Sequence, residues 1–482
     1  MAGQVVELVR RIAGGHAQAE VNATHSALAL TRFANSYIHQ NVTEATDTVT
    51  LRLHLDGRTA TGSTTVTSDD GLRALVERTL AAARLCPPDP TWPGLAPPAP
   101  LGGTAPWDGA TAYASPDERA QRVRAFVDAA GGLTTAGYCR TTRLSGAFAN
   151  SAGQAVSGRT AAAAMDGIAR IDGVDGLARL AAPRLAELDG AVLGRRAADK
   201  ARAGTAPVEL PPGRYEVVLE PTAVADVLQN LARYGFGGKA YNERQSFAVL
   251  GAEQFDPSVT LVDDALATAA LPFDIEGTPR RSVPLVSRGV TRTITHDRQR
   301  AAEAGVESTG HASATARYWG PIPLGMRLEP AGSPDSPDPD SAATDPTAAG
   351  PNATGSTGAD PTGSGPGEVP GPVVDADTAR LVSGVRRGLL ITDFWYTRVL
   401  DPRTLVVTGL TRNGVWLIED GEVGTAVRDF RFTQSYPQAL APGAVLGLGR
   451  HTARQPDSWD SIWWTAPPIR LAAWNFTGGA SG

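Results

Sequence analysis

Turn-forming residue pairs, set between segments of alternating apolar and polar residues, constrain the fold of this chain most. Asp56-Gly57 separates Thr48–Leu55 from Arg58–Thr67, and both segments have the alternation of half-buried strands. Asn413-Gly414 and Asp420-Gly421 divide the sequence near the C-terminus in the same way. Because Asn-Gly and Asp-Gly favour the tight turns of β-hairpins, these pairs predict hairpins near both ends of the chain.

Helical signals alternate with these β segments. Asp69–Leu85 has apolar residues along one helical face, and Ser115 followed by Glu118 has the spacing of a capping box at a helix start. We also expect helices over Gly176–Arg202 and Thr222–Tyr234. The predicted fold class is α+β, with N-terminal α/β units followed by a mostly β C-terminal domain.

The length and the Pro-rich interruptions predict three domains. A chain of 482 residues is too long for one compact core, and we place the domains at residues 1–95, 107–205 and 213–476. The third is interrupted at about residues 330–373, where Pro, Gly, Ser, Asp, Ala and Thr dominate. We predict that this insertion is disordered, since it has too few apolar residues to offset the entropy lost on ordering. A solvated surface loop is the simpler interpretation, and a partner-docking segment is the alternative.

The composition excludes several classes of protein. A net charge of -6 gives no basic surface for nucleic acid, and no segment has the roughly 18–20 apolar residues of a membrane span. The N-terminus has the pattern of an amphipathic helix and not of a signal peptide. The two cysteines, Cys86 and Cys139, are too few for a disulfide scaffold. These features predict a cytoplasmic protein without a membrane or nucleic-acid partner.

Several short segments, in consistent order, resemble the TldD/PmbA family, in which a catalytic TldD chain pairs with a TldE (PmbA) chain. The resemblance runs from about Leu30 to Phe476. The segments that carry it are LTRFANSYIHQ at Leu30–Gln40, FDIEG at Phe273–Gly277, ESTG at Glu307–Gly310, LLITDFWYTR at Leu389–Arg398, TGLTRNG at Thr408–Gly414 and WLIEDG at Trp416–Gly421.

Catalytic members of that family carry an HExxxH motif on a helix of the third domain and a cysteine near the C-terminus, which together hold zinc. In this chain Gln229 and Tyr234 fall at the two histidine positions, Asn230 falls at the glutamate position, and no cysteine follows Cys139. An amide and a phenol are poor zinc ligands beside imidazole or thiolate, and an asparagine cannot take a proton from water. The resemblance therefore implies a TldE-type chain that has no metal or cofactor of its own.

What the resemblance implies next is a heterodimer with a TldD-type catalytic subunit that holds the zinc. The two chains would enclose a chamber that admits unfolded peptides and cuts them. Two alternatives stay open. The chain can be a self-associating homodimer that binds peptides without hydrolysis. It can also be an independent hydrolase that uses Ser308 and His311, with Asp297 nearby in the sequence.

Five residues are candidates for binding peptide. Asp274 lies in an acidic turn that could grip a peptide amine, although an aspartate that caps its own turn is the simpler interpretation. Arg412 could clamp a peptide carboxylate with its planar fork, or form a surface salt bridge. The other candidates lie in two turns of small and polar residues, namely Ser308, Thr309 and Asn413.

Overall fold

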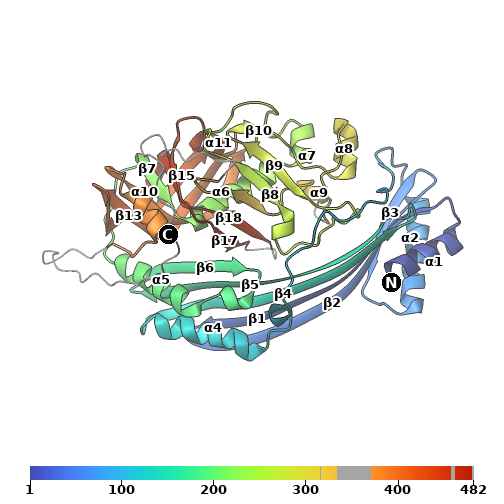
Figure 1. Cartoon of the computed structure of the whole chain (residues 1–482), viewed down its shortest axis with the longest axis horizontal. Coiled ribbons are helices and arrows are strands. Elements are labelled where there is room, and N and C mark those ends of the chain that lie inside the picture. Colours follow the sequence, from blue (N-terminus) through green and yellow to red (C-terminus); the bar gives the residue numbers. More distant parts are fainter. Residues whose placement is uncertain (315, 334–370, 458–461, 480–482) are drawn as a thin grey trace, which may run out of the picture.

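A long antiparallel sheet forms the N-terminal part of the chain. The computed structural model describes residues 1–314, 316–333, 371–457 and 462–479. The first sheet has the strand order β3-β2-β1-β4-β5-β6. Its four central strands are long and curve along the whole length of the molecule (Figure 1). The strands are β1 (Gln18–Ala34), β2 (Tyr37–Leu55), β3 (Arg58–Thr64), β4 (Thr134–Asn150), β5 (Ala155–Ile171) and β6 (Val174–Ala182).

Both predicted N-terminal domains contribute to this one sheet. Strand β1, from the predicted domain 1–95, pairs with β4, from the predicted domain 107–205, in unbroken register from Glu20–Asn150 to Phe33–Gly137. The Pro-rich segment between them therefore connects elements that share a sheet. The predicted disordered tract at about 330–373 lies largely outside the described residues.

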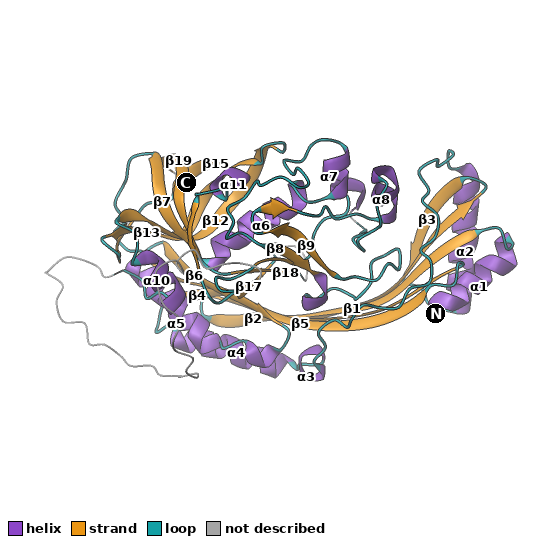
Figure 2. Cartoon of the chain, turned by 45° about the horizontal axis from the view of Figure 1, so that its top comes forward, coloured by secondary structure: helices purple, strands orange, loops and turns teal. Residues whose placement is uncertain are grey.

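Helices cover the outer, convex side of the sheet at its two ends (Figure 2). At one end, α1 and α2 pack on a core that includes Val21, Val49 and Leu51. At the other end, Phe33 and Met165 share a core with residues of α4 and α5. The helices are α1 (Ala2–Ala13), α2 (Asp69–Leu85), α3 (Gly109–Ala112), α4 (Pro116–Ala129) and α5 (Gly190–Ala203), with a short 3-10 turn, η1 (Leu185–Glu187).

Two helix predictions are confirmed here. Helix α2 has the predicted bounds, and Ser68 caps it. Helix α4 begins after Ser115, whose hydroxyl accepts a hydrogen bond from the Glu118 N–H, while the Glu118 carboxylate accepts one from the Ser115 N–H. The capping box therefore fixes this helix start as its spacing predicted.

The prediction of one helix over Gly176–Arg202 was wrong in its first part. Residues 174–182 form β6, which pairs with β5 from Val174–Ile171 to Ala182–Ala163. Helix α5 starts only at Gly190, and the side chain of Asp189 caps its N-terminus. Small apolar residues fit both a helix face and a strand, and the neighbouring strand β5 decides between them.

The C-terminal part contains two further sheets. One has the order β10-β9-β8-β11-β18-β17, and its strands are β8 (Leu261–Asp264), β9 (Ser282–Ser287), β10 (Val290–Thr291), β11 (Met326–Leu328), β17 (Ala453–Pro456) and β18 (Trp463–Ala466). The other has the order β12-β7-β19-β15-β13-β14, with β16 paired to β19. It closes on itself, because β12 also pairs with β13. Its strands are β7 (Gly213–Leu219), β12 (Arg387–Asp401), β13 (Val406–Glu419), β14 (Glu422–Ala426), β15 (Phe430–Ser435), β16 (Val445–Leu448) and β19 (Ile469–Gly479).

One apolar core joins these two sheets to helix α6 (Pro221–Tyr234). Shorter helices occupy the connections, and they are α7 (Gly238–Asn242), η2 (Ala265–Ala267), α8 (Arg298–Ala304), α9 (Ala316–Trp319), α10 (Ala376–Val382) and α11 (Tyr436–Ala439). Together with the N-terminal sheet these elements confirm the predicted α+β class. Within the described residues, no helix is long and apolar enough to span a membrane.

The predicted hairpin at Asn413-Gly414 was wrong, whereas the one at Asp420-Gly421 is confirmed. Strand β13 continues through Asn413 and Gly414, which have φ values of 60° and 133°. The register with β12 shifts there, so the two residues form a bulge inside the strand. At Asp420-Gly421 the chain reverses from β13 into β14.

The C-terminal part rests on the inner, concave face of the long sheet (Figure 1). Near one end, the Asn22 amide donates to the Ile275 carbonyl at 2.6 Å, and Arg52 pairs with Glu276 at 3.0 Å. Near the other end, Arg179 on β6 pairs with Asp393 on β12 at 3.1 Å. Charged contacts therefore fix the C-terminal part at two separated places on the sheet.

Candidate functional site around helix α6

Helix α6 carries Gln229, Asn230 and Tyr234, the three residues that the resemblance aligns with the catalytic motif. It begins directly after β7, with Pro221 in its first turn, where the missing N–H costs nothing. Its apolar side is buried in the core, through Val224, Val227, Leu228 and Leu231 among others. The polar side chains at helical spacing from one another are Asp226, Gln229, Asn230 and Arg233.

Asp226 is the central acid of this helix, and its partners are neutral. Its carboxylate accepts hydrogen bonds from the Tyr436 hydroxyl at 2.7 Å and the Thr397 hydroxyl at 2.8 Å. The Asn230 amide donates to the same carboxylate at 3.3 Å and to the Asp226 carbonyl at 3.0 Å. Burial raises the Asp226 pKa to about 6, although the hydroxyl donors favour the ionised form.

Gln229 faces a cation of the same chain. With its amide oxygen directed at Arg233, it accepts a hydrogen bond from the guanidinium at 3.0 Å. Arg233 lies 3.4 Å from a carboxylate oxygen of Asp457, which also accepts from the Trp464 indole at 3.1 Å. The Gln229 side chain, which the resemblance aligns with the first histidine, is thus hydrogen-bonded to a guanidinium.

Tyr234 lines a cavity of about 390 Å³ at the end of α6. Its ring meets the Trp319 ring edge to face at a centroid distance of 5.3 Å. Burial raises the pKa of the Tyr234 phenol, so this hydroxyl stays protonated at neutral pH. The other lining residues combine aromatic, aliphatic and charged side chains, including Lys239, Glu243, Tyr318, Val399 and Pro402.

Arg412 and Asn413 lie on β13, beside β12. The Arg412 guanidinium stacks on the Trp395 ring at 4.4 Å, and the Trp395 side chain is exposed. The Asn413 amide donates to Asp393 at 3.2 Å, the same carboxylate that Arg179 binds. Arg412 also lies near Asp429, whose pKa burial raises to about 6. No salt bridge to Arg412 occurs in the described part of the chain, so the surface salt bridge considered from the sequence does not form there.

Asp274 and the Ser308–Thr309 turn come together elsewhere in the C-terminal part. The Asp274 carboxylate accepts from the N–H groups of Glu276 and Thr278 at 2.9 Å each, as expected for an aspartate that caps its own turn. Its second oxygen accepts from the Ala312 N–H at 3.0 Å, which ties it to the segment after Thr309. Burial, followed by the charge of Glu276, raises the Asp274 pKa to about 7.

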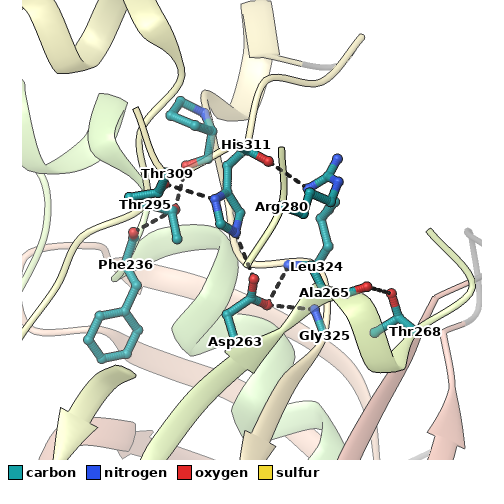
Figure 3. Close-up of polar contacts among 12 residues, drawn as sticks. Phe236, Asp263, Ala265, Thr268, Arg280, Thr295, Thr309, His311, Leu324 and Gly325 are labelled. Carbon is teal, nitrogen blue, oxygen red and sulfur yellow. Dashed lines mark hydrogen bonds and ion pairs between the residues drawn. The ribbon is translucent and has the colours of Figure 1, made fainter. Parts of the chain in front are cut away.

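The residues named for a hydrolase do not form a linked set. The His311 ring is fully buried and bonds Thr309 at 2.8 Å and Asp263 at 2.6 Å (Figure 3). Ser308 instead donates to the His296 carbonyl at 3.2 Å, and Asp297 caps helix α8. Burial opposes ionisation of Asp263, but His311 and the Gly325 N–H outweigh it and lower its pKa.

Sequence reasoning missed the side chains that hold the predicted positions in place. Asp226 and Arg233 each lie four residues from a predicted position on α6, so helical spacing could have found them. Asp263 and Asp393 are brought in by distant strands, and no local signal marks them. Among the described residues, no three His, Cys, Asp or Glu side chains are grouped so that they could hold a metal ion.

The fold is thus α+β, and helix α6 follows strand β7 of the closed sheet and presents a row of polar side chains. Sequence models of one family match both ends of the chain. The PmbA/TldA metallopeptidase domain 1 matches residues 19–83, and the PmbA/TldA metallopeptidase C-terminal domain matches residues 212–334 and 348–478. The second match alone covers more than half of the chain, so the protein belongs to the PmbA/TldD family.

Solved structures share the whole fold at low sequence identity. TldE from Thermococcus kodakarensis is 17% identical, with a TM-score of 0.80, and 99% of each chain is covered. A proposed modulator of DNA gyrase from Thermotoga maritima is 16% identical, with a TM-score of 0.77 and coverage of 99% of this chain and 100% of that one. Another from Bacteroides thetaiotaomicron is 16% identical, with a TM-score of 0.75 and coverage of 99% and 98%. These likenesses establish the fold alone, and no curated protein matches the chain.

Proposed function

We propose that this chain is the non-catalytic, TldE-like subunit of a cytoplasmic TldD/TldE-type zinc metallopeptidase that degrades or processes unfolded peptides. The observation that carries the proposal is the contact between Gln229 and Arg233. A guanidinium fixed on the residue at the first histidine position would repel a zinc ion. The Asn230 amide is also already hydrogen-bonded, since it donates to Asp226.

The residues on α6 therefore do not fit zinc, and no catalytic step is assigned to them. The proposal places zinc and water activation on a TldD-type partner. The contribution of this chain is to bind and orient an extended peptide. The cavity of about 390 Å³ beside Tyr234 supports this role, because aromatic walls and a charged rim suit a peptide side chain and its backbone.

The direct test is reconstitution with a TldD-type subunit that has an intact HExxxH motif. The two chains are purified separately and mixed, and mass is measured by light scattering while hydrolysis of an unstructured peptide is followed. We expect a one-to-one complex and activity that needs both chains. A peptidase that is equally active without this chain would overturn the proposal.

The cavity is tested in the same complex. Trp319→Ala removes one aromatic wall, and we expect KM to rise by about tenfold with kcat changed less, because peptide binding is weakened and the partner's chemistry is not. Tyr37→Ala, a change at an exposed aromatic residue outside this cavity, is the matched control. Equal KM values for wild type and Trp319→Ala would show that the cavity does not bind the peptide.

Self-association is the second outcome that the light-scattering measurement separates. A stable dimer of this chain that binds the peptide without cutting it, and that does not exchange with the TldD-type subunit, would support the homodimeric peptide-binding alternative. The proposal predicts instead that any self-associated form dissociates when the partner is added.

A further inference from the structure

A shallow cavity of about 540 Å³ lies on the convex face of the long sheet, away from α6. Helices cover both ends of this face and leave the middle of the strands open between α1 and α3 (Figure 2). The floor includes Ala23 on β1 and Ala147 on β4, which lie directly opposite each other. The small side chains at these positions leave space above the middle of the sheet. At both ends of the sheet, larger apolar side chains fill the corresponding space.

Polar residues cross this floor in a single row. Asp47, His25, Ser145 and Arg159 are directly opposite one another on β2, β1, β4 and β5. Since directly opposite residues point to the same face of a sheet, all four side chains face the cavity. The His25 ring is bonded at Nδ1 to Asp47 at 2.9 Å and at Nε2 to Arg143 at 3.3 Å.

Two guanidinium groups lie close to one end of the row, that of Arg159 in the row and that of Arg143 on the neighbouring strand β4. Arg159 stacks on Trp107 at 4.4 Å, and Arg143 stacks on Tyr113 at 4.6 Å. The two arginines are diagonal neighbours on adjacent strands, where Cα atoms are about 7–8 Å apart and long side chains can reach a common point. The aromatic rings therefore hold the two positive charges close together.

Among the described residues, neither guanidinium has an acidic partner of its own. In the part of the chain that the structure describes, no carboxylate lies within salt-bridge distance of Arg143 or Arg159. The Arg143 Nε is buried and has no hydrogen-bond partner there. Two guanidinium groups close together repel each other, so an anion between them would offset a cost that the folded chain otherwise carries.

We propose that this cavity binds the phosphate group of a small molecule. The guanidinium fork of Arg159 would hold its oxygens, and Ser145 and Ser157 would donate from the floor. Arg143 lies outside the cavity lining and would add its positive charge from beside His25. A tetrahedral phosphate accepts hydrogen bonds from several directions, whereas a carboxylate is satisfied by one fork. The Asp47–His25 pair fixes Arg143 from the other side through the His25 Nε2.

The test is titration of inorganic pyrophosphate into the full chain, followed by calorimetry. We expect a Kd of about 1 mM or tighter at low salt, and a loss of at least about tenfold in Arg143→Ala and in Arg159→Ala. Arg32→Ala is the matched control, because Arg32 is an exposed arginine on the same strand as His25 but on its opposite face. It should bind pyrophosphate as the wild type does.

Two further binding measurements test the phosphate assignment, one with a variant of the cavity floor and one with citrate. Ser157→Leu fills the floor without removing a charge, so it should block binding even where an arginine variant folds poorly. Citrate carries similar charge on carboxylates and should bind at least about tenfold more weakly. Absence of binding to the wild type, equal binding by Arg159→Ala, or equal affinity for citrate would each overturn the phosphate assignment. The outcome is independent of peptide hydrolysis, which this experiment does not measure.

Discussion

The Asp226 carboxylate is largely buried, and all the side chains that donate hydrogen bonds to it are neutral. Tyr436, Thr397 and Asn230 bond it, and none of them carries a charge. Hydroxyl and amide donors support the ionised form less than a paired cation would, so burial dominates and the pKa is raised to about 6. At the scale of single residues, α6 thus keeps a titratable group one turn before the glutamate position.

Asp226→Asn should change how stability depends on pH. Because the folded-state pKa of about 6 exceeds the unfolded value of 3.8, wild-type stability is fully present below about pH 4 and falls as pH rises through 6. The asparagine removes this fall and should raise the unfolding free energy at pH 7.5 by about 2 kcal/mol. Urea unfolding at several pH values checks this, with the exposed Asp128→Asn as control. A variant less stable than wild type at pH 7.5 would contradict it.

Alanine at Gln229 or Asn230 should leave the reconstituted peptidase largely active. Neither side chain is expected to touch zinc, since one faces Arg233 and the other bonds Asp226. We expect kcat within about tenfold of wild type, which corresponds to less than about 1.4 kcal/mol of barrier. A larger loss in a complex of unchanged mass would mean that these amides take part in the chemistry.

At the scale of elements, β13 illustrates how a local turn signal can be overruled. Asn413-Gly414 has a hairpin sequence, but Leu410 and Val415 on either side of it both pair with β12. The strand therefore continues, and the positive φ values that suit a turn serve a bulge instead. The bulge places Arg412 over Trp395 and Asn413 on Asp393.

Gly414→Ala should destabilise this bulge. The residue has a φ of 133°, and an added Cβ would overlap the Trp416 ring, which is fully buried. We expect a loss of at least about 2 kcal/mol of unfolding free energy, from backbone strain and displacement of the ring together. Chemical denaturation measures it, and the exposed turn glycine Gly443, which has open space around it, is a comparison site for the same substitution. Equal losses at both sites would argue against a role for Trp416.

Sequence predicts those parts of the fold whose signals are local. The bounds of α2 and the capping box of α4 depend on residues within one turn, and both are confirmed. The strand at 174–182 was missed because its partner β5 decides the conformation. In the site, helical spacing groups Gln229 and Asn230, but Asp263, which holds His311, lies 48 residues away and could not be inferred from spacing.

At the scale of the whole molecule, a buried acidic cluster joins the long sheet to the C-terminal part. Glu20 and Glu276 lie on opposite sides of this contact and share Arg52, at 3.3 and 3.0 Å. One oxygen of Glu20 is buried and has no hydrogen-bond partner in the described part of the chain. Burial raises the Glu20 pKa to about 8, against the attraction of Arg52, so the contact holds a proton at neutral pH.

The contact between the two parts should weaken in mild alkali. Glu20 stabilises the fold fully below its ordinary pKa of 4.5, and this contribution is lost as pH rises towards 8; Asp274 adds a similar loss towards 7. Glu20→Gln should flatten the fall between about pH 5 and 8 and exceed wild-type stability at pH 9 by more than about 1 kcal/mol. Thermal unfolding across this range measures it, with the exposed Glu77→Gln as control. An unchanged slope in Glu20→Gln would contradict this assignment.

The decisive experiment is elemental analysis of the zinc content of this chain alone and of its complex with an HExxxH-bearing TldD-type subunit. We expect no bound zinc in the isolated chain after dialysis, and about one zinc per heterodimer. We also expect the zinc to stay with the partner when the two chains are separated. Stoichiometric zinc on the isolated chain would contradict the assignment of α6 as a helix without metal ligands.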